Sequence, residues 1–106
     1  MQLKTKTKEA WGKTLEKKLK ALANQFSEIK AIYQKKTSWG MEVHYVGDFV
    51  DREREDAFYR EEGEILAWSP EGKLWTHLFN PNNFADPGPF LEPEGSVKIF
   101  GRDSYS

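Results

Sequence analysis

The sequence contains no cysteine, which excludes disulfide bonds, thiolate metal sites and cysteine nucleophiles. Histidine is scarce as well: only His44 and His77 occur, and they lie in different segments. No serine or aspartate stands at a spacing typical of a hydrolase triad. Neither a glycine-rich phosphate loop nor a Gly-Lys-Ser/Thr motif is present. We therefore predict that the protein is not an enzyme and has no catalytic residues, metal or cofactor.

Long apolar runs are also missing. No stretch approaches the roughly 18 residues that span a bilayer, and the first residues are polar and rich in lysine, unlike a secretory leader. The sequence thus predicts a cytoplasmic protein with no membrane partner. The 106 residues are 38% hydrophobic and 14% aromatic, which suffices for one modest core. We expect a single domain over residues 1–106.

Charges of opposite sign are concentrated in the two parts of the chain, although the net charge is only −1. Residues 1–39 hold ten lysines and three glutamates, whereas residues 40–106 hold six basic and 14 acidic side chains. This asymmetry indicates either a basic helix that packs on the acidic remainder, or a basic segment that binds an acidic partner. The sequence leaves both interpretations open.

A long amphipathic helix is predicted over residues 9–36, because apolar residues recur there at every third or fourth position. These apolar residues are Trp11, Leu15, Leu19, Leu22, Phe26, Ile29 and Tyr33. Lysines occupy the opposite side of the expected helix. Gly40 follows as a candidate stop signal, and residues 1–8 are expected to be frayed.

From residue 41 the apolar pattern alternates, which predicts an antiparallel meander of four to five strands over residues 41–100. Strands are expected at 41–46, 57–60, 64–68, 73–79 and 96–100, and residues 51–56 as a charged turn or short helical piece. Turns that end in glycine are predicted at 61–63, 69–72 and 92–95, the last two with proline as well. The predicted fold class is therefore α+β, with one long N-terminal helix packed on an antiparallel sheet.

A loop over residues 80–91 contains three prolines, which exclude it from the interior of a sheet. Loops of this length are often functional. Both faces of the expected strands are apolar, whereas a single helix covers only one face. The second face must therefore be covered by this loop, by a second subunit or by a partner.

We predict an accessory or regulatory protein that binds another protein, or a second copy of itself, through the aromatic second face of the sheet and the proline-rich loop. The candidate binding residues are Trp75, His77, Phe79, Phe84 and Phe90.

Two alternatives remain. The lysines of the expected helix, Lys13, Lys17 and Lys20, could bind a nucleic-acid backbone, although the acidic half would repel phosphate from the aromatic rings. A small-molecule pocket or enzyme site could also lie between helix and curved sheet. Its candidate residues are His44, His77, Tyr45 and Tyr59.

Overall fold

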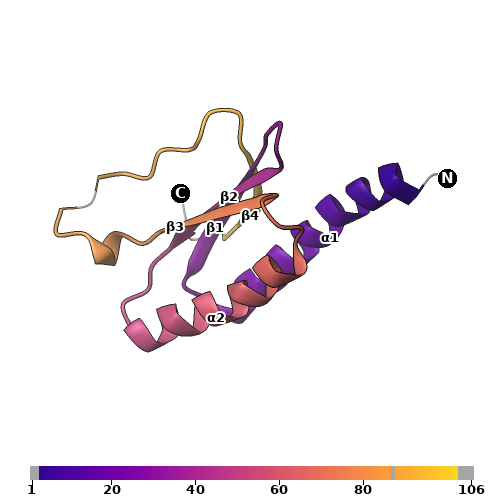
Figure 1. The fold of residues 1–106 in the computed structure, drawn as a ribbon. Coiled ribbons are helices and arrows are strands. Elements are labelled where there is room, and N and C mark those ends of the chain that lie inside the picture. The colour runs from indigo at the N-terminus through magenta and orange to yellow at the C-terminus, as the bar shows by residue number, and fades with distance from the viewer. Residues whose placement is uncertain (1–2, 87, 103–106) are drawn as a thin grey trace.

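Two helices lie on one side of a four-stranded sheet (Figure 1). The computed structural model describes residues 3–86 and 88–102. The elements are α1 (Leu3–Gln25), β1 (Ile29–Lys36), β2 (Met41–Gly47), α2 (Arg52–Trp68), β3 (Leu74–Phe79), the 3₁₀ helix η1 (Pro81–Asn83) and β4 (Val97–Gly101). The fold class is α+β, as predicted, but α2 was not foreseen.

The sheet is mixed, so the prediction of a purely antiparallel sheet is wrong. Its strand order is β3-β2-β1-β4. β1 pairs antiparallel with both β2 and β4, whereas β2 and β3 are parallel. Parallel neighbours need a long crossover connection rather than a tight turn, and α2 provides it. The segment from β2 through α2 to β3 is therefore a βαβ unit.

The predicted helix over residues 9–36 ends early, because α1 stops at Gln25 and the last eight residues of the prediction form β1. A turn at 27–28 separates the two elements. β1 is buried on both faces, and its pairing with β2 is irregular between Ile29 and Ala31. Its apolar residues therefore do not alternate strictly, and their spacing resembles that of a helix. Residues 3–8, expected to be frayed, belong to α1, while residues 1–2 lie outside the described part.

The strands predicted at 57–60 and 64–68, and the turn between them, are instead helix α2. Asp51 caps this helix, since its side chain accepts a hydrogen bond from the Glu53 N–H at 2.9 Å. The buried stripe of α2 consists of Glu55, Phe58, Glu62 and Ile65. Two glutamates at core positions hide the helical period, and Gly63 inside the helix imitates a turn signal.

Both proline–glycine turns are present. Gly72 has φ of 76° and Gly95 has φ of 82°, a backbone conformation that glycine adopts readily. The second turn introduces β4, as expected. The first turn connects α2 to β3 rather than two strands, because a type of turn fixes the local path of the chain and not the element that precedes it.

The main core lies between the helical layer and the sheet, and its centre is Phe58. The Phe58 ring is fully buried and its centroid lies 5.0 Å from that of Tyr45, 5.5 Å from Phe49 and 5.7 Å from Phe26. Leu22 and Phe26, two of the apolar residues of the predicted helix, are both buried. The rings of Phe26, just after α1, of Tyr45 in β2 and of Phe49, just after β2, therefore all contact Phe58 of α2.

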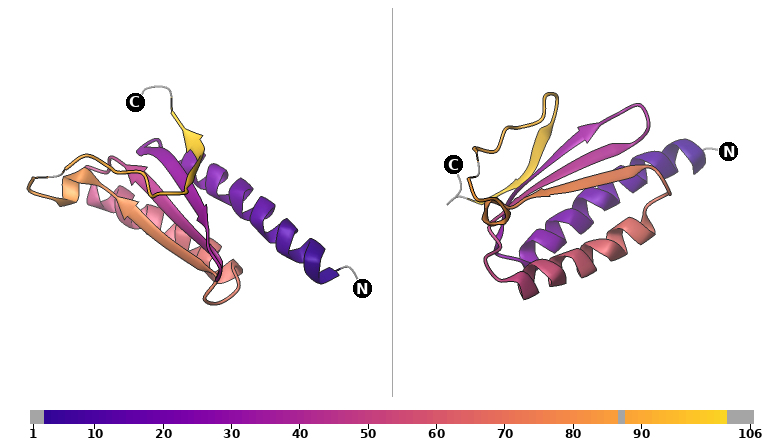
Figure 2. Two further views of the ribbon diagram at one scale, coloured as in Figure 1. Left: turned by 90° about the horizontal axis from the view of Figure 1, so that it is seen from above. Right: turned by 60° about the vertical axis from the view of Figure 1, so that its left-hand side comes forward.

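The helical layer also brings the two oppositely charged parts of the chain together. α1 and α2 lie side by side (Figure 2), and a groove of about 360 Å³ between them is lined by Lys18 of α1 and by Glu61 and Glu64 of α2. At the end of this layer Arg54 donates to Glu28 at 2.9 Å, which lowers the pKa of the Glu28 carboxyl. The lysine and glutamates that line the groove support the interpretation that the basic helix packs on the acidic remainder, whereas in the Arg54–Glu28 pair the acidic part of the chain supplies the cation.

Replacement of Phe58 should test whether this ring organises the core. Phe58→Ala should lower the free energy of unfolding by roughly 3–5 kcal/mol, because it leaves a cavity among three other rings. Urea denaturation followed by circular dichroism would measure the change. Trp39→Ala, at an exposed aromatic in the β1–β2 turn, is the control and should cost less than about 1 kcal/mol. Equal losses in the two variants would contradict the assignment.

Candidate functional site

The candidate site is the face of the sheet that lies away from the helices, which we call the open face. Side chains alternate between the two faces of a strand. Met41, Val43 and Tyr45 of β2 belong to the core, so the intervening Glu42, His44 and Val46 point to the open face. The parallel register places His44 beside His77 and Val46 beside Phe79.

Three aromatic side chains from the two strands form an aromatic patch on this face: His44, Trp75 and His77. The ring centroids of Trp75 and His77 lie 6.0 Å apart with planes only 10° from parallel. The His44 ring lies 5.3 Å from Trp75 and 6.4 Å from His77. Trp75 remains 47% exposed, and His77 is exposed as well. The patch is therefore held by two paired strands and is open to solvent.

Glu42 fixes the orientation of the half-buried His44, since the His44 Nε2 lies 3.2 Å from the Glu42 Oε1. Lys35 of β1 is the register partner of Glu42 on the other side. A negative and a positive side chain, Glu42 and Lys35, thus lie next to the patch on the sheet. No hydroxyl nucleophile takes part in the contacts of these three rings.

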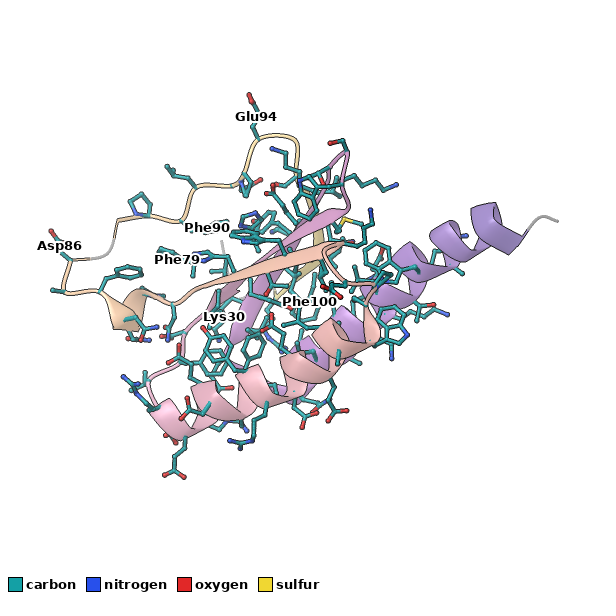
Figure 3. The ribbon with its side chains drawn as sticks, in the orientation of Figure 1. Lys30, Phe79, Asp86, Phe90, Glu94 and Phe100 are labelled. Carbon is teal, nitrogen blue, oxygen red and sulfur yellow. The ribbon has the colours of Figure 1, made fainter. Side chains whose placement is uncertain are left out.

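The proline-rich loop covers the other end of the open face. Phe90 packs on Tyr33 and Phe79, with ring centroids 5.4 and 5.6 Å apart, and Phe84 stacks on Phe79 at 6.0 Å. Figure 3 shows Phe79 and Phe90 between the loop and the sheet, whereas Phe100 lies on the side of the helices. The five residues predicted to bind protein are therefore split: Trp75 and His77 stay open, Phe79 and Phe90 pack together under the loop, and Phe84 stacks on Phe79 but remains 53% exposed.

Asn80, which sequence reasoning missed, anchors the start of this loop. Its fully buried side chain accepts a hydrogen bond from the Phe49 N–H at 3.2 Å and donates to the Phe49 carbonyl at 3.0 Å. The Asn80 side chain thus makes two hydrogen bonds with the Phe49 backbone, as a residue of a neighbouring strand would. Asn82 adds a bond to Asp48 at 2.7 Å. The sequence Asn-Pro-Asn at the end of a predicted strand could have indicated a turn held by asparagine side chains.

A pocket of about 420 Å³ lies beside the covered end of the open face. It is lined by Lys30, Val46, Gly47, Asp48, Phe79, Pro81, Gly88, Pro89 and Phe90. The four residues predicted for a pocket between helix and sheet do not converge: Tyr45 is buried in the core, Tyr59 is on α2, and the two histidines are on the open face. The residues proposed for a pocket between helix and sheet therefore do not form one site.

The helix lysines predicted to bind nucleic acid, Lys13, Lys17 and Lys20, are all exposed on α1. Lys20 is 2.9 Å from Glu16 one turn earlier. They belong to the helical layer, whereas the aromatic patch is on the opposite face of the sheet. A single strand of nucleic acid could not use both at once.

Two further searches concern the described residues alone. Within residues 3–86 and 88–102, no three histidine, aspartate or glutamate side chains come together in a way that could hold a metal ion. In the same part of the chain, neither helix is long and apolar enough to cross a bilayer.

Comparison of the chain with protein-family models, with curated proteins and with solved structures gave no match. The functional argument is therefore built from the geometry of the chain itself.

One buried carboxyl lies beneath the patch, on the core side of the sheet. Glu62 of α2 is only 4% exposed. Burial raises its pKa above the usual value of 4.5, and interactions with the hydroxyls of Thr76 and Tyr45 oppose this rise. Burial also raises the pKa of Tyr45, and the neighbouring Glu62 adds to this effect. The enclosed position of Glu62 makes it a determinant of stability rather than a group that reaches a ligand.

The raised pKa of Glu62 predicts a pH-dependent stability. The protonated carboxyl is favoured in the folded state, so its contribution is fully present below about pH 4.5 and is lost as the pH rises through the folded-state pKa. Glu62→Gln should therefore be more stable than the parent at pH 7, and the difference should shrink as the pH falls towards 4.5. Urea denaturation between pH 4 and pH 8 measures it. Glu64→Gln controls for the loss of one negative charge from α2, and a difference for Glu62→Gln that does not vary with pH would contradict the prediction.

Proposed function

We propose that the chain is a non-enzymatic binding protein whose aromatic patch docks a protein partner. The observation that carries this proposal is the position of Trp75, His77 and His44. Their rings contact one another on a paired part of the sheet, yet neither the helices nor the loop covers them. Large exposed aromatic groups in mutual contact are uncommon on surfaces that meet only water.

The chemistry of the patch fits a protein surface. A tryptophan offers a large contact area and one N–H donor, and it loses little conformational entropy on binding when neighbouring rings already hold it. Tryptophan is also enriched among the residues that dominate binding energy in interfaces. Glu42 and Lys35, which follow the patch along the sheet, supply the polar surroundings that such anchors usually have. We infer a partner with an apolar side chain that inserts over Trp75.

The loop has a supporting role in this proposal. Phe90 and Phe84 shield Phe79, and Asn80 holds the loop at its start. A partner therefore meets Trp75 and His77 directly and the outer surface of the loop at its margin. Of the binding residues predicted from sequence, the proposal keeps Trp75 and His77 at the centre and the exposed Phe84 at the margin, and it adds His44.

Nucleic acid remains the competing occupant of the aromatic rings. Many of the acidic side chains that argued against it belong to α2, in the other layer, but the exposed lysines of α1 also lie in that layer. Beside the patch, phosphate would meet Glu42, which approaches His44, together with Lys35, and the exposed lysines of α1 would lie on the other side of the sheet. A steep dependence of binding on salt is the behaviour that would favour nucleic acid.

Matched tryptophan variants test the proposal. Trp75→Ala should weaken binding to the partner at least about tenfold, since a central aromatic anchor is lost, and should leave the thermal melt nearly unchanged because the ring is half exposed. Trp68→Ala, at an exposed tryptophan in the helical layer, should bind like the parent. The tagged proteins would be compared as baits in one lysate by quantitative mass spectrometry, and the captured partner would be titrated in purified form.

Three results would contradict this function. Full retention of the partner by Trp75→Ala would remove the patch from the interface. A large drop in melting temperature for Trp75→Ala would show that the ring is structural. Nucleic acid that copurifies with the parent and is lost from the Trp75→Ala variant would show that the patch binds nucleic acid instead of protein.

A further inference from the structure

The free edge of β3 lacks the features that normally keep edge strands from pairing. β3 lies at one end of the sheet, and its sequence, LWTHLF, contains no charged residue, proline or glycine. Its pairing with β2 is also free of irregularities. Edge strands of natural proteins usually carry lysine, proline or a bulge that prevents further pairing. The opposite edge, β4, contains Lys98 and pairs irregularly with β1.

One hydrogen bond shows which backbone groups of β3 face the free edge. The Lys73 carbonyl accepts from the Met41 N–H at 2.9 Å, so the backbone groups of residue 73 face β2. In a parallel strand these groups point to alternate sides at successive residues. The N–H and C=O groups of Leu74, Thr76 and Leu78 therefore point to the free edge.

An apolar flank of α2 lies beneath the same edge. Glu61, Ile65 and Trp68 face α1 across the groove, so the opposite flank of α2 faces away from α1. This opposite flank presents Tyr59 and Leu66, which are 46% and 39% exposed. They lie two turns apart, close to Gly63, where an added Cβ would meet no atom within 4 Å.

A contact after β3 confirms which way this flank faces. The Asn83 Nδ2 donates to the Glu55 Oε2 at 3.0 Å, and Glu55 is on the same side of α2 as Tyr59, one turn earlier. Asn83 follows β3 in the chain and lies just beyond its end. The β3 edge and the outer flank of α2 thus form one continuous side of the molecule, with a strand above and a helix below.

We propose that this side binds a second copy of the chain across a two-fold axis at Thr76. Antiparallel pairing of two β3 strands about this residue sets Thr76 against Thr76 of the second copy, and Leu74 against Leu78 of the second copy. In that register every outward-facing N–H and C=O of the three residues finds a partner. The sheet and the helical layer both continue into the second copy.

Three features select a second copy rather than an unrelated strand. The edge carries no charge, so two identical edges do not repel each other. The same axis runs the two α2 helices antiparallel, which brings Tyr59 towards Leu66 of the second copy around the open space at Gly63, a self-complementary arrangement. An isolated peptide strand would pair with β3 but would leave the helix flank exposed.

The pairing also joins the two open faces. Trp75 comes opposite His77 of the second copy, so the two aromatic patches become one surface across the axis. The dimer nevertheless stands apart from the partner proposed above, because the dimer is formed by the edge and the helix flank, and the partner is bound by the face.

Sedimentation velocity on the full chain over a wide concentration range tests the dimer. The parent should sediment as a dimer. Leu66→Glu should raise the dissociation constant at least about tenfold, because the two-fold axis places both new carboxylates in one interface. Thr76→Pro removes an N–H that faces away from β2, so pairing between copies should be lost, and it also removes the hydroxyl that interacts with Glu62, so the fold should be less stable. Val97→Glu, at a 64% exposed position on the opposite edge, should dimerise like the parent.

The outcomes separate the alternatives. A parent that is monomeric up to millimolar concentration overturns the proposal, as does a dimer that both Leu66→Glu and Thr76→Pro leave unchanged. A dimer lost only in Val97→Glu places the interface at β4 and also overturns it. Circular dichroism shows whether each variant is folded, and if Thr76→Pro is unfolded, the exposed Leu66 position decides alone.

Discussion

The parallel pairing of β2 with β3 is the constraint on which the rest of the structure depends. Parallel neighbours cannot be joined by a tight turn, so the chain must leave the sheet and return, and α2 forms in that connection. The returning strand then becomes the edge of the sheet. The same pairing places His44 beside His77 and buries Phe58 against the rings of Phe26, just after α1, and Tyr45 in β2. Core, open face and free edge all follow from one strand pairing.

The sequence predicted those parts of the fold that depend on local pattern. The amphipathic part of α1 from residue 9, the strands β2, β3 and β4, and the glycine turns at 69–72 and 92–95 came from periodicity and turn chemistry, whereas the turn predicted at 61–63 was wrong. The rest depended on tertiary contacts. β1 has a helical spacing because apolar layers cover both of its faces, with Tyr33 under the loop and Ile32 in the core. α2 was hidden because Glu55 and Glu62 occupy core positions, where partners distant in sequence accommodate them.

The sequence predicted which residues of β3 share a face, but it did not predict which of them the loop covers. Alternation along β3 correctly put Trp75, His77 and Phe79 on one face. Their separation into an open and a covered part could not be predicted, because it depends on how far the loop reaches over the sheet, and Asn80 sets that reach through two bonds to Phe49. The result is a face whose Trp75 and His77 rings are open to solvent, beside an edge of the sheet that has no neighbouring strand.

Amide hydrogen exchange along β3, followed by NMR in dilute protein, tests this strand assignment most directly. If β3 pairs with β2 alone, the amides of Trp75 and His77 should be protected, while those of Thr76 and Leu78 should exchange rapidly and become protected as the concentration rises. Protection of all four amides in protein that sedimentation shows to be monomeric would contradict the assignment, since it would place β3 inside the sheet with neighbours on both sides.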